Sequence, residues 1–269
     1  MQPVLDWIQI TFLALVQGLT EFLPISSSGH LLLFPQLFGW PDQGLAFDVA
    51  VHLGTLLAVM GYFRQDIARM AVAWGQGLIQ HKTTPDAQLA WAVIVATVPA
   101  VLLGLLINQG FEALLRNPLL IAGTTIGFGA LLWWADVRGR QNRTEYDLRW
   151  SDVIFLGLAQ SLALIPGTSR SGITMTAALI LGLTRQAAAR FSFLLSIPII
   201  AGAGLLKGLD LVASPAPIHW QALLGGALMS FVAAWIVIAL FLKWIERIGM
   251  APFAWYRFAL GGLLLWVFI

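Results

Sequence analysis

Six long apolar runs decide what this chain can fold into. They lie at residues 45–63, 87–107, 118–135, 187–206, 218–242 and 251–269. Each is about as long as the roughly 20 residues that a helix needs to cross the hydrocarbon core of a bilayer. Only 10% of the 269 residues are charged and 59% are hydrophobic, whereas a soluble domain carries about a quarter charged residues. The sequence therefore predicts an all-α polytopic membrane protein with six transmembrane helices.

Two further apolar segments, residues 4–38 and 151–183, are interrupted in the middle by clusters of proline, glycine and serine. Backbone that leaves the helical conformation inside a membrane is tolerated only where protein or water satisfies its free amides and carbonyls. We therefore expect each segment to form a re-entrant hairpin, in which two short helices are joined by a loop. The alternative for the first segment is an ordinary spanning helix over residues 4–23, followed by an interfacial loop.

The order of these elements predicts an inverted-topology repeat within a single integral membrane domain, residues 1–269. Each repeat has one hairpin and three spans, and because three is an odd number the second repeat starts from the opposite side of the membrane. Repeat one covers residues 1–135, repeat two covers residues 151–269, and a hydrophilic loop at 136–150 joins them. Five identities at an offset of 143 residues support the pairing: Gln17 with Gln160, Leu19 with Leu162, Ser26 with Ser169, Ser28 with Ser171 and Gly29 with Gly172.

The basic residues predict the orientation. With these spans, most of them fall on one side of the membrane: Arg64, Arg69, Lys82, Arg138, Arg140, Arg143, Arg149, Arg185, Arg190, Lys243 and Arg247. Arg116 and Lys207 fall on the other side. The positive-inside rule makes the first side cytoplasmic, so both termini and the mouth of the first hairpin are expected to face outside. The net charge is only +2 despite a pI of about 9.3, so these residues indicate charged loops rather than a surface that binds nucleic acid.

Two further features narrow the chemistry and the processing. The chain contains no cysteine, which excludes disulfides, thiolate metal sites and cysteine nucleophiles within it. No basic n-region precedes the first apolar run and no small-residue cleavage site follows it. We therefore expect this run to be retained rather than removed as a signal peptide.

The first hairpin carries Gln17-Gly-Leu-Thr-Glu21-Phe-Leu-Pro-Ile-Ser26-Ser27-Ser28-Gly-His30. Such polar groups are costly in an apolar segment unless they are paired, hydrated or used. Hydroxyl residues and glycine ahead of a helix suit its N-terminus, where free amides and the helix dipole attract an anion such as phosphate. Ser27 is then a candidate nucleophile with His30 as its base, and Glu21 a candidate to orient His30 or to hold a divalent metal. The alternative is that the serines only cap the helix and that His30 is an interfacial histidine.

The second hairpin carries Pro166-Gly167-Thr-Ser169-Arg170-Ser171-Gly172 and then Thr174. The planar guanidinium of Arg170 matches the geometry of phosphate oxygens. The alternative is a structural salt bridge between Arg170 and Glu21, because an unpaired buried charge is costly. At the offset of 143, Glu21, Ser27 and His30 align with Leu164, Arg170 and Ile173. One hairpin therefore carries the candidate reacting groups and the other carries the candidate anion clamp.

Other polar groups in the spans give weaker signals. Asp48 and His52 are four residues apart at the outer end of a span, where they would line a substrate entrance or face lipid headgroups. Arg257 lies near the start of the last span, from which its side chain can snorkel to the cytoplasmic interface.

These motifs resemble those of the undecaprenyl-diphosphate phosphatases of the BacA/UppP type. The resemblance runs nearly end to end, through residues 17–30, 166–172, 191–195 and 252–258. Members of that family are hydrolases of the bacterial inner membrane that remove the terminal phosphate from undecaprenyl diphosphate. Their product is the carrier lipid of peptidoglycan synthesis, hence of cell wall biogenesis and cell shape, and their loss sensitises cells to bacitracin.

The resemblance also implies roles at matching positions. Glu21 would be essential and tied to a Mg²⁺ or Ca²⁺ ion or to proton transfer, Ser27 the nucleophile, His30 its acid/base partner and Arg170 the diphosphate clamp. The expected substrate-binding residues are Gln17, Ser26, Ser28, Gly167, Ser169, Ser171 and Thr174. The family motif begins with Glu or Gln, and an amide cannot be an obligatory base. The presence of Gln17 therefore shifts the emphasis to Glu21.

The resulting expectation is a multi-pass inner-membrane phosphatase whose site faces the periplasm or outside. Its polyprenyl diphosphate substrate would enter laterally from the lipid, with the headgroup between the hairpin tips. Direct attack by water, with Ser27 only a ligand, is an open alternative. The rival class is a secondary carrier or flippase for a lipid phosphate or another anion, because inverted repeats with broken helices are typical of transporters. A structural membrane scaffold is a third reading, and the sequence allows a homo-oligomer.

Overall fold

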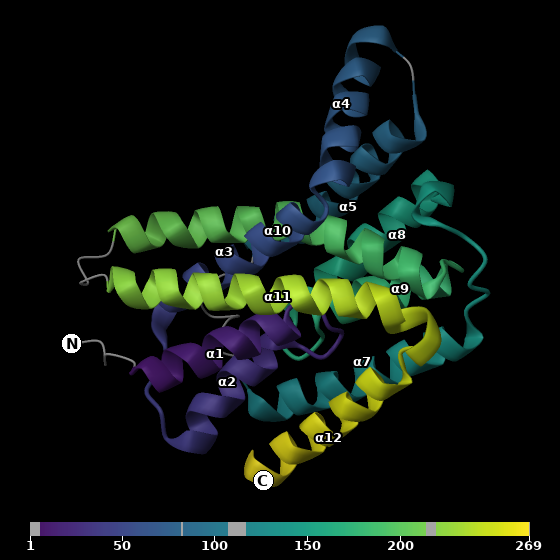
Figure 1. Ribbon diagram of the computed structural model, residues 1–269. Coiled ribbons are helices and arrows are strands. Elements are labelled where there is room, and N and C mark those ends of the chain that lie inside the picture. Colours follow the sequence, from purple (N-terminus) through teal and green to yellow (C-terminus); the bar gives the residue numbers. More distant parts are fainter. Residues whose placement is uncertain (1–5, 82, 107–116, 214–218, 269) are drawn as a thin grey trace.

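Helices form the whole of the bundle in the computed structural model, which describes residues 6–81, 83–106, 117–213 and 219–268 (Figure 1). In chain order they are α1 (Trp7–Thr20), α2 (Ser27–Phe38), α3 (Gly44–Tyr62), α4 (Arg64–Gln80), α5 (Pro85–Leu106), α7 (Pro118–Arg138), α8 (Trp150–Ser161), α9 (Arg170–Ile180), α10 (Arg185–Ala213), α11 (Trp220–Ile248) and α12 (Ala251–Phe268). Two 3-10 helices, η1 (Glu145–Asp147) and η2 (Leu162–Leu164), lie between them. No β-strand occurs in these ranges, which confirms the predicted all-α class.

Six of the described helices, α3, α5, α7, α10, α11 and α12, are long and apolar enough to cross a membrane. The prediction of a polytopic membrane protein is therefore confirmed. The structure extends three of the predicted spans at their C-terminal ends: α7 continues to Arg138, α10 past Lys207 and α11 past Lys243. A single lysine ends an apolar run without ending a helix, since lysine is a good helix former. Several predicted features lie outside the described residues: positions 4, 5, 107, 218 and 269, and the side chains of Lys82 and Arg116.

One helix lies outside the apolar runs. Residues 64–86 separate the first two runs and have no such run of their own, but α4 occupies most of them and projects away from the bundle (Figure 1). This helix is amphipathic rather than apolar: Met70 is buried and Ile67 and Trp74 pack against the core, whereas Arg69 is exposed. Hydropathy alone misses such a helix, because its apolar residues recur only every three or four positions.

Two pairs of short helices, α1 with α2 and α8 with α9, are each separated by a non-helical tip. Pro24 lies in the first tip, residues 21–26, and Pro166 in the second, residues 165–169. Proline lacks the N–H that a continuing helix requires, which favours a break at both places, although Pro35, Pro99 and Pro198 lie inside continuous helices. The residue directly before the second helix of each pair has a positive φ, 70° at Ser26 and 69° at Ser169. The two tips therefore share an uncommon backbone conformation at equivalent positions.

The packing of these pairs crosses the chain from one half to the other. Helix α1 packs against α11, and α8 packs against α5. Likewise α3 packs against α11 and α10 packs against α5, while α7 and α12 pack against each other. A Cβ atom at Gly18 would lie 2.6 Å from the carbonyl oxygen of Ser230, so glycine is what permits α1 to approach α11 this closely. The two halves interlock rather than lying side by side.

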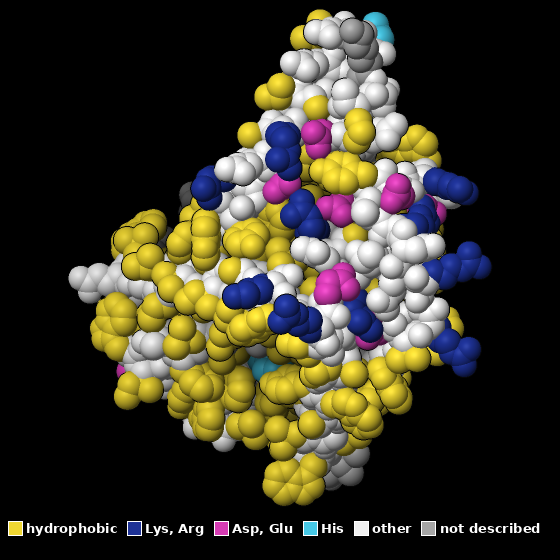
Figure 2. Space-filling model, turned by 45° about the vertical axis from the view of Figure 1, so that its right-hand side comes forward, with side chains coloured by type: hydrophobic (Ala, Val, Ile, Leu, Met, Phe, Trp, Pro, Cys, Tyr) yellow, Lys and Arg dark blue, Asp and Glu magenta, His cyan; other side chains and the backbone are white. Residues whose placement is uncertain are grey.

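Charged side chains gather at the end of the bundle where α7 ends and α10 begins (Figure 2). Ion pairs hold that end together. Arg190 contacts Asp66 at 2.9 Å and Glu145 at 2.6 Å, so it joins α10 to the start of α4 and to η1. Arg185 pairs with the buried Asp136 at 2.6 Å. Asp136 and Glu145 therefore serve packing at this end of the bundle.

Candidate active site

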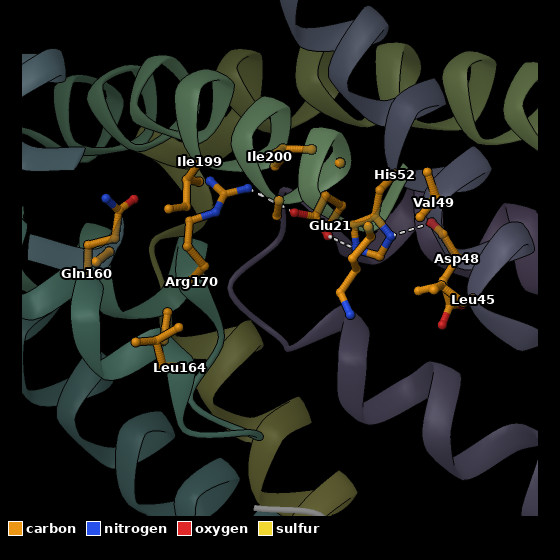
Figure 3. Close-up of a pocket in the computed structure, with 15 residues that line it drawn as sticks. Glu21, Leu45, Asp48, Val49, His52, Gln160, Leu164, Arg170, Ile199 and Ile200 are labelled. Atoms are coloured by element: carbon orange, nitrogen blue, oxygen red, sulfur yellow. Dashed lines mark hydrogen bonds and ion pairs between the residues drawn. The ribbon is translucent and has the colours of Figure 1, made fainter. Parts of the chain in front are cut away.

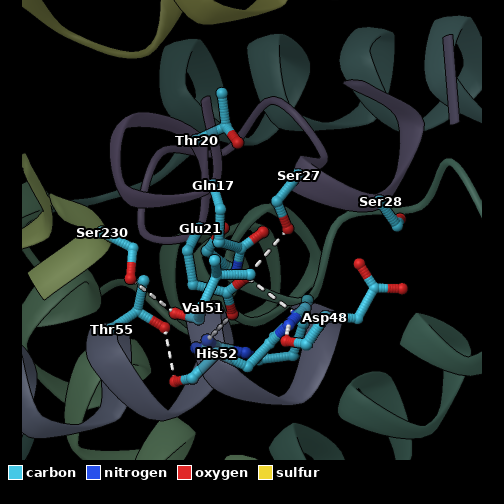
Figure 4. A network of polar contacts seen from close by, with 12 residues as sticks. Gln17, Thr20, Glu21, Ser27, Ser28, Asp48, Val51, His52, Thr55 and Ser230 are labelled. Atoms are coloured by element: carbon cyan, nitrogen blue, oxygen red, sulfur yellow. Dashed lines mark hydrogen bonds and ion pairs between the residues drawn. The ribbon is translucent and has the colours of Figure 1, made fainter. Parts of the chain in front are cut away.

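The carboxylate of Glu21 joins the two tips. Glu21 follows α1 directly and is 9% exposed. Its Oε1 accepts a hydrogen bond from Nη2 of Arg170 at 2.9 Å. Its Oε2 accepts from Oγ of Ser27 at 2.8 Å and from Nε2 of Gln17 at 3.0 Å (Figure 4). Ser27 and Arg170, which the sequence predicts to act with Glu21, thus both contact its carboxylate, although Arg170 lies 149 residues after Glu21.

Arg170 is the first residue of α9, and its side chain is 12% exposed. Besides its ion pair with Glu21, it donates from Nη1 to the backbone carbonyl of Ser192 at 3.2 Å. The hydroxyl of Ser192 lies 2.7 Å from that of Thr174, which holds α9 against α10. A guanidinium has five N–H groups, and the described hydrogen bonds engage two of them. The ion pair expected under the structural alternative for Arg170 is present, and it lies in the wall of a pocket.

That pocket has a volume of about 370 Å³, within the usual range for ligand sites. Figure 3 shows Arg170, Glu21, His52 and Asp48 along it. The rest of the lining is largely apolar and comes mainly from α3, α10 and the segment around η2: Leu45, Val49, Ala100, Gln160, Ala163, Leu164, Ile199, Ile200, Ala203, Gly204 and Lys207. A few charges at one point of an apolar cavity suit an anionic headgroup that carries a hydrocarbon chain.

His52 stands closer to this centre than sequence reasoning indicated. Its Nε2 lies 3.8 Å from Oε2 of Glu21, and its Nδ1 lies 2.7 Å from the backbone carbonyl of Asp48. A carbonyl can only accept, so Nδ1 carries a proton and Nε2 is the nitrogen directed at the carboxylate. The spacing of Asp48 and His52 predicts a polar patch that lines a substrate entrance or faces lipid headgroups. The contact with Glu21, from a different helix, was not visible in the sequence.

His30, the expected base for Ser27, is engaged elsewhere. It is 2% exposed, and its Nδ1 lies 2.7 Å from the carbonyl of Ser26. Its Nε2 lies 2.6 Å from the hydroxyl of Tyr256, whose ring stacks on the imidazole with centroids 5.5 Å apart. The structure therefore does not bring His30 and Ser27 into the expected hydrogen bond. The carbonyl of Ser26 competes with the hydroxyl of Ser27 for the imidazole of His30, because the first turn of α2 places this carbonyl beside the imidazole. A catalytic role for His30 stays a prediction.

The remaining predicted residues lie in the tips or in the first turn of the helix that follows each tip. The hydroxyls of Ser26 and Ser28 lie 3.3 Å apart, and those of Ser169 and Ser171 lie 3.2 Å apart. Ser171 also donates to the carbonyl of Leu23 at 2.8 Å, which ties the second tip to the first. The carbonyl of Gly167 points back toward α7 and α12, as described below. Substrate contacts of these residues stay a prediction.

Arg257 does not snorkel. It is completely buried, and its described hydrogen bonds all go to backbone carbonyls. The prediction that Arg257 snorkels is wrong because the position of a residue along a span does not show whether it faces lipid or the interior of the bundle.

The pocket offers few side chains that could bind a divalent cation. Among the described residues, no three His, Cys, Asp or Glu side chains lie together in a group that could hold a metal ion. Glu21 and Asp48 do line the same pocket. Magnesium is commonly held by one or two carboxylates together with substrate phosphates and waters. The residues therefore fit an ion that binds together with a phosphate group.

The chain is similar to one protein family and to several curated relatives over nearly its whole length. The family model described as "Bacitracin resistance protein BacA" matches residues 10–263. A protein of Alteromonas mediterranea named undecaprenyl-diphosphatase is 60% identical over 259 residues, which cover 96% of this chain and 97% of the relative. A relative of the same name in Nitrosococcus oceani is 56% identical over 264 residues, covering 98% and 100%. In Stutzerimonas stutzeri, a relative named undecaprenyl-diphosphatase 2 is 57% identical over 267 residues, covering 98% and 99%.

Proposed function

The chain belongs to the BacA family, and from this premise we propose how it converts undecaprenyl diphosphate to undecaprenyl phosphate and inorganic phosphate. The enzyme is a membrane-bound undecaprenyl-diphosphatase, as the family and the names of its relatives indicate. The observation that carries the proposed mechanism is the carboxylate of Glu21, which accepts from Ser27 on one oxygen and from Arg170 on the other inside the pocket. Glu21 and Arg170 line the cavity, and the hydroxyl of Ser27 reaches it through the carboxylate that they share.

We place the diphosphate in this pocket, with its polyprenyl chain along the apolar wall. Phosphoryl transfer requires mainly positioning and neutralisation of charge. Arg170 and the free amides at the start of α9 would supply both for the terminal phosphate. A Mg²⁺ or Ca²⁺ ion, held by Glu21 and the phosphate oxygens, would add further neutralising charge.

In the first step Oγ of Ser27 forms a bond to the terminal phosphorus, and the bond to the bridging oxygen breaks. Undecaprenyl phosphate leaves with that electron pair, and the proton of Ser27 passes to Oε2 of Glu21. In the second step a water oxygen bonds to the phosphorus, the bond from Oγ to phosphorus breaks, and Ser27 regains its proton from Glu21. The water's protons leave with the phosphate. The competing mechanism is direct attack by water on the terminal phosphorus, in which Ser27 only binds the substrate.

We further propose that the helix pairs α1–α2 and α8–α9 are the re-entrant hairpins of an inverted repeat, residues 1–135 and 151–269. Two observations support this. The tips share a positive φ at Ser26 and Ser169, and the packing of α1 on α11 is mirrored by the packing of α8 on α5. The charged end of the bundle would face the cytoplasm of the bacterial inner membrane. The pocket, near the opposite ends of α3 and α10, would open to the outer side.

The first test uses the purified protein in detergent with undecaprenyl diphosphate and Mg²⁺. The wild type should release phosphate, and Ser27→Ala should lower the rate by at least about 10³-fold, because the attacking oxygen is lost. Ser151→Ala is the control, since it removes a hydroxyl from an exposed position of α8 that does not line the pocket. Acid quenching with substrate labelled on the terminal phosphate should trap phosphate on Ser27.

Full activity of Ser27→Ala would exclude a covalent course and leave direct attack by water. If the wild type releases no phosphate while liposomes containing it translocate a lipid phosphate, the carrier reading replaces the phosphatase. If substitutions in both tips changed neither phosphate release nor lipid-phosphate translocation, the interpretation as a structural membrane scaffold would remain.

The lipid route gives a second prediction. Ala203 lies on the face of α10 that lines the pocket, and Ala203→Phe should fill part of the space next to the headgroup. We expect kcat/KM to fall by about 10²-fold, because displacement by about 1 Å can cost that much. Ala201→Phe is the matched control: Ala201 is two residues away, on another face of the same helix, and does not line the pocket. Equal kinetics in the two variants would contradict the proposed route.

A further inference from the structure

Arg257 occupies an unusual environment. Its side chain is wholly buried in the bundle. Its partners are all backbone carbonyls: Thr125 at 3.0 Å, Thr168 and Gly167 at 2.9 Å, Pro24 at 3.3 Å and Thr124 at 3.5 Å. Among the described residues, no carboxylate lies within ion-pair distance of it. Burying a guanidinium without a counterion is costly, so the carbonyl dipoles alone solvate this charge.

These carbonyls belong to three separate parts of the chain. Pro24 lies in the first tip, Gly167 and Thr168 lie in the second tip, and Thr124 and Thr125 lie in the middle of α7. A single planar group from α12 therefore fixes both tips against the same span. Five N–H groups in a rigid fork are what this arrangement requires, and lysine does not offer them.

Two glycines make room for the guanidinium and its stem. A Cβ atom at Gly172 would lie 2.8 Å from Nη1 of Arg257, and a Cβ at Gly129 would lie 3.0 Å from Cβ of Arg257. Gly167 itself has φ +84°, and a Cβ there would lie 2.5 Å from the carbonyl of Ile121. The space is fitted to an arginine, and a single added methyl group disturbs it.

The clamped backbone carries the reacting groups. Pro24 lies midway between Glu21 and Ser27, and Thr168 lies two residues before Arg170. The spacing of the two tips therefore sets the contact between Arg170 and Glu21, which is 2.9 Å. Because Arg257 does not line the pocket, its effect on substrate must pass through these residues.

We propose that Arg257 is a positioning residue of the hydrolysis, which holds the two tips at the separation that the pair of Glu21 and Arg170 needs. The inference rests on the proposed site. Tyr256, its neighbour in α12, strengthens the same connection, because its hydroxyl bonds His30 in the helix that follows the first tip.

Kinetics provide the first test. Arg257→Lys keeps the positive charge but loses the planar fork, and we expect kcat to fall by about 10²-fold while KM changes less than about threefold. A merely structural role would lower kcat only in proportion to the folded fraction, which size-exclusion chromatography measures in parallel. Arg247→Lys, on the exposed last turn of α11, is the matched control. Wild-type kcat in Arg257→Lys would overturn the inference, whereas inactive wild-type protein would refute the proposed function instead.

A second measurement does not depend on activity. The chain has no cysteine, so a Leu19→Cys and Leu162→Cys pair can carry two spin labels. The two positions are related by the offset of 143, flank the two tips and are exposed, at 46% and 41%. The distance distribution should broaden or shift in Arg257→Lys. Should that variant not fold, Gly172→Ala keeps Arg257, presses on its guanidinium and should give the same change. An unaltered distribution in the folded variants, with unaltered kcat, would refute the clamp.

Discussion

Replacing Glu21 by glutamine should lower phosphate release from undecaprenyl diphosphate by at least about 10³-fold, the largest effect that we expect from any single isosteric change. The amide keeps the shape of the side chain but removes the charge that Arg170 and Ser27 contact at 2.9 and 2.8 Å. It leaves Arg170 without its carboxylate and Ser27 without a proton acceptor. A buried charge that loses its partner costs several kcal/mol.

The measurement is the initial rate of phosphate release, with the melting temperature as a check on folding. Asp147→Asn is the control for the same chemical change, because Asp147 is the exposed last residue of η1 and the described hydrogen bonds to its carboxylate come only from Thr144. Glu21→Gln with a rate within tenfold of the wild type would show that Glu21 serves structure alone.

Arg170→Lys should reduce kcat by about 10³-fold, in the range found when an arginine that stabilises a transferring phosphoryl group is lost. Lysine preserves the charge but cannot contact Glu21 and the carbonyl of Ser192 with one planar group, as Arg170 does at 2.9 and 3.2 Å. The inhibition constant of inorganic phosphate should rise as well, because the same fork is proposed to bind the product.

The double variant with Glu21→Gln should lose little more than either single variant, since residues that act as a unit are not additive. Arg64→Lys, at the exposed start of α4, supplies the control. If the two losses multiplied in full, the proposal that the pair acts as one unit would be wrong.

Hydropathy was sufficient to predict the spans, because a membrane helix needs about 20 apolar residues wherever it lies in the bundle. The two broken segments were predicted for a similar reason, since Pro24 and Pro166 interrupt helices locally. Hydropathy does not predict α4, because the apolar residues of this helix face one side only. It also does not predict the end of α10, because Lys207 does not stop the helix. Both errors arise where helix formation and hydrophobicity no longer coincide.

The candidate site was predictable where its residues lie in one motif and unpredictable where contacts cross the chain. Glu21, Ser27 and Arg170 were identified because each is a costly group in an apolar segment. For His52 the sequence predicts a substrate entrance or a contact with lipid headgroups. Its contact with Glu21 is not predictable, because that contact depends on how α3 packs against α1. The pairing of Ser27 with His30 was favoured by their spacing. It was displaced by the carbonyl of Ser26, a backbone competitor that residue patterns do not reveal.

The interlocked packing also has a consequence for how the protein is made. Synthesis delivers Glu21 to the bilayer long before the ribosome reaches Arg170, and α1 is made well before α11, the helix on which it packs. Until then the first half holds a carboxylate without its cation and an apolar helix without its neighbour. The newly made segment therefore needs lipid headgroups, water or an insertion factor as a temporary partner, and the active site closes only near the end of translation.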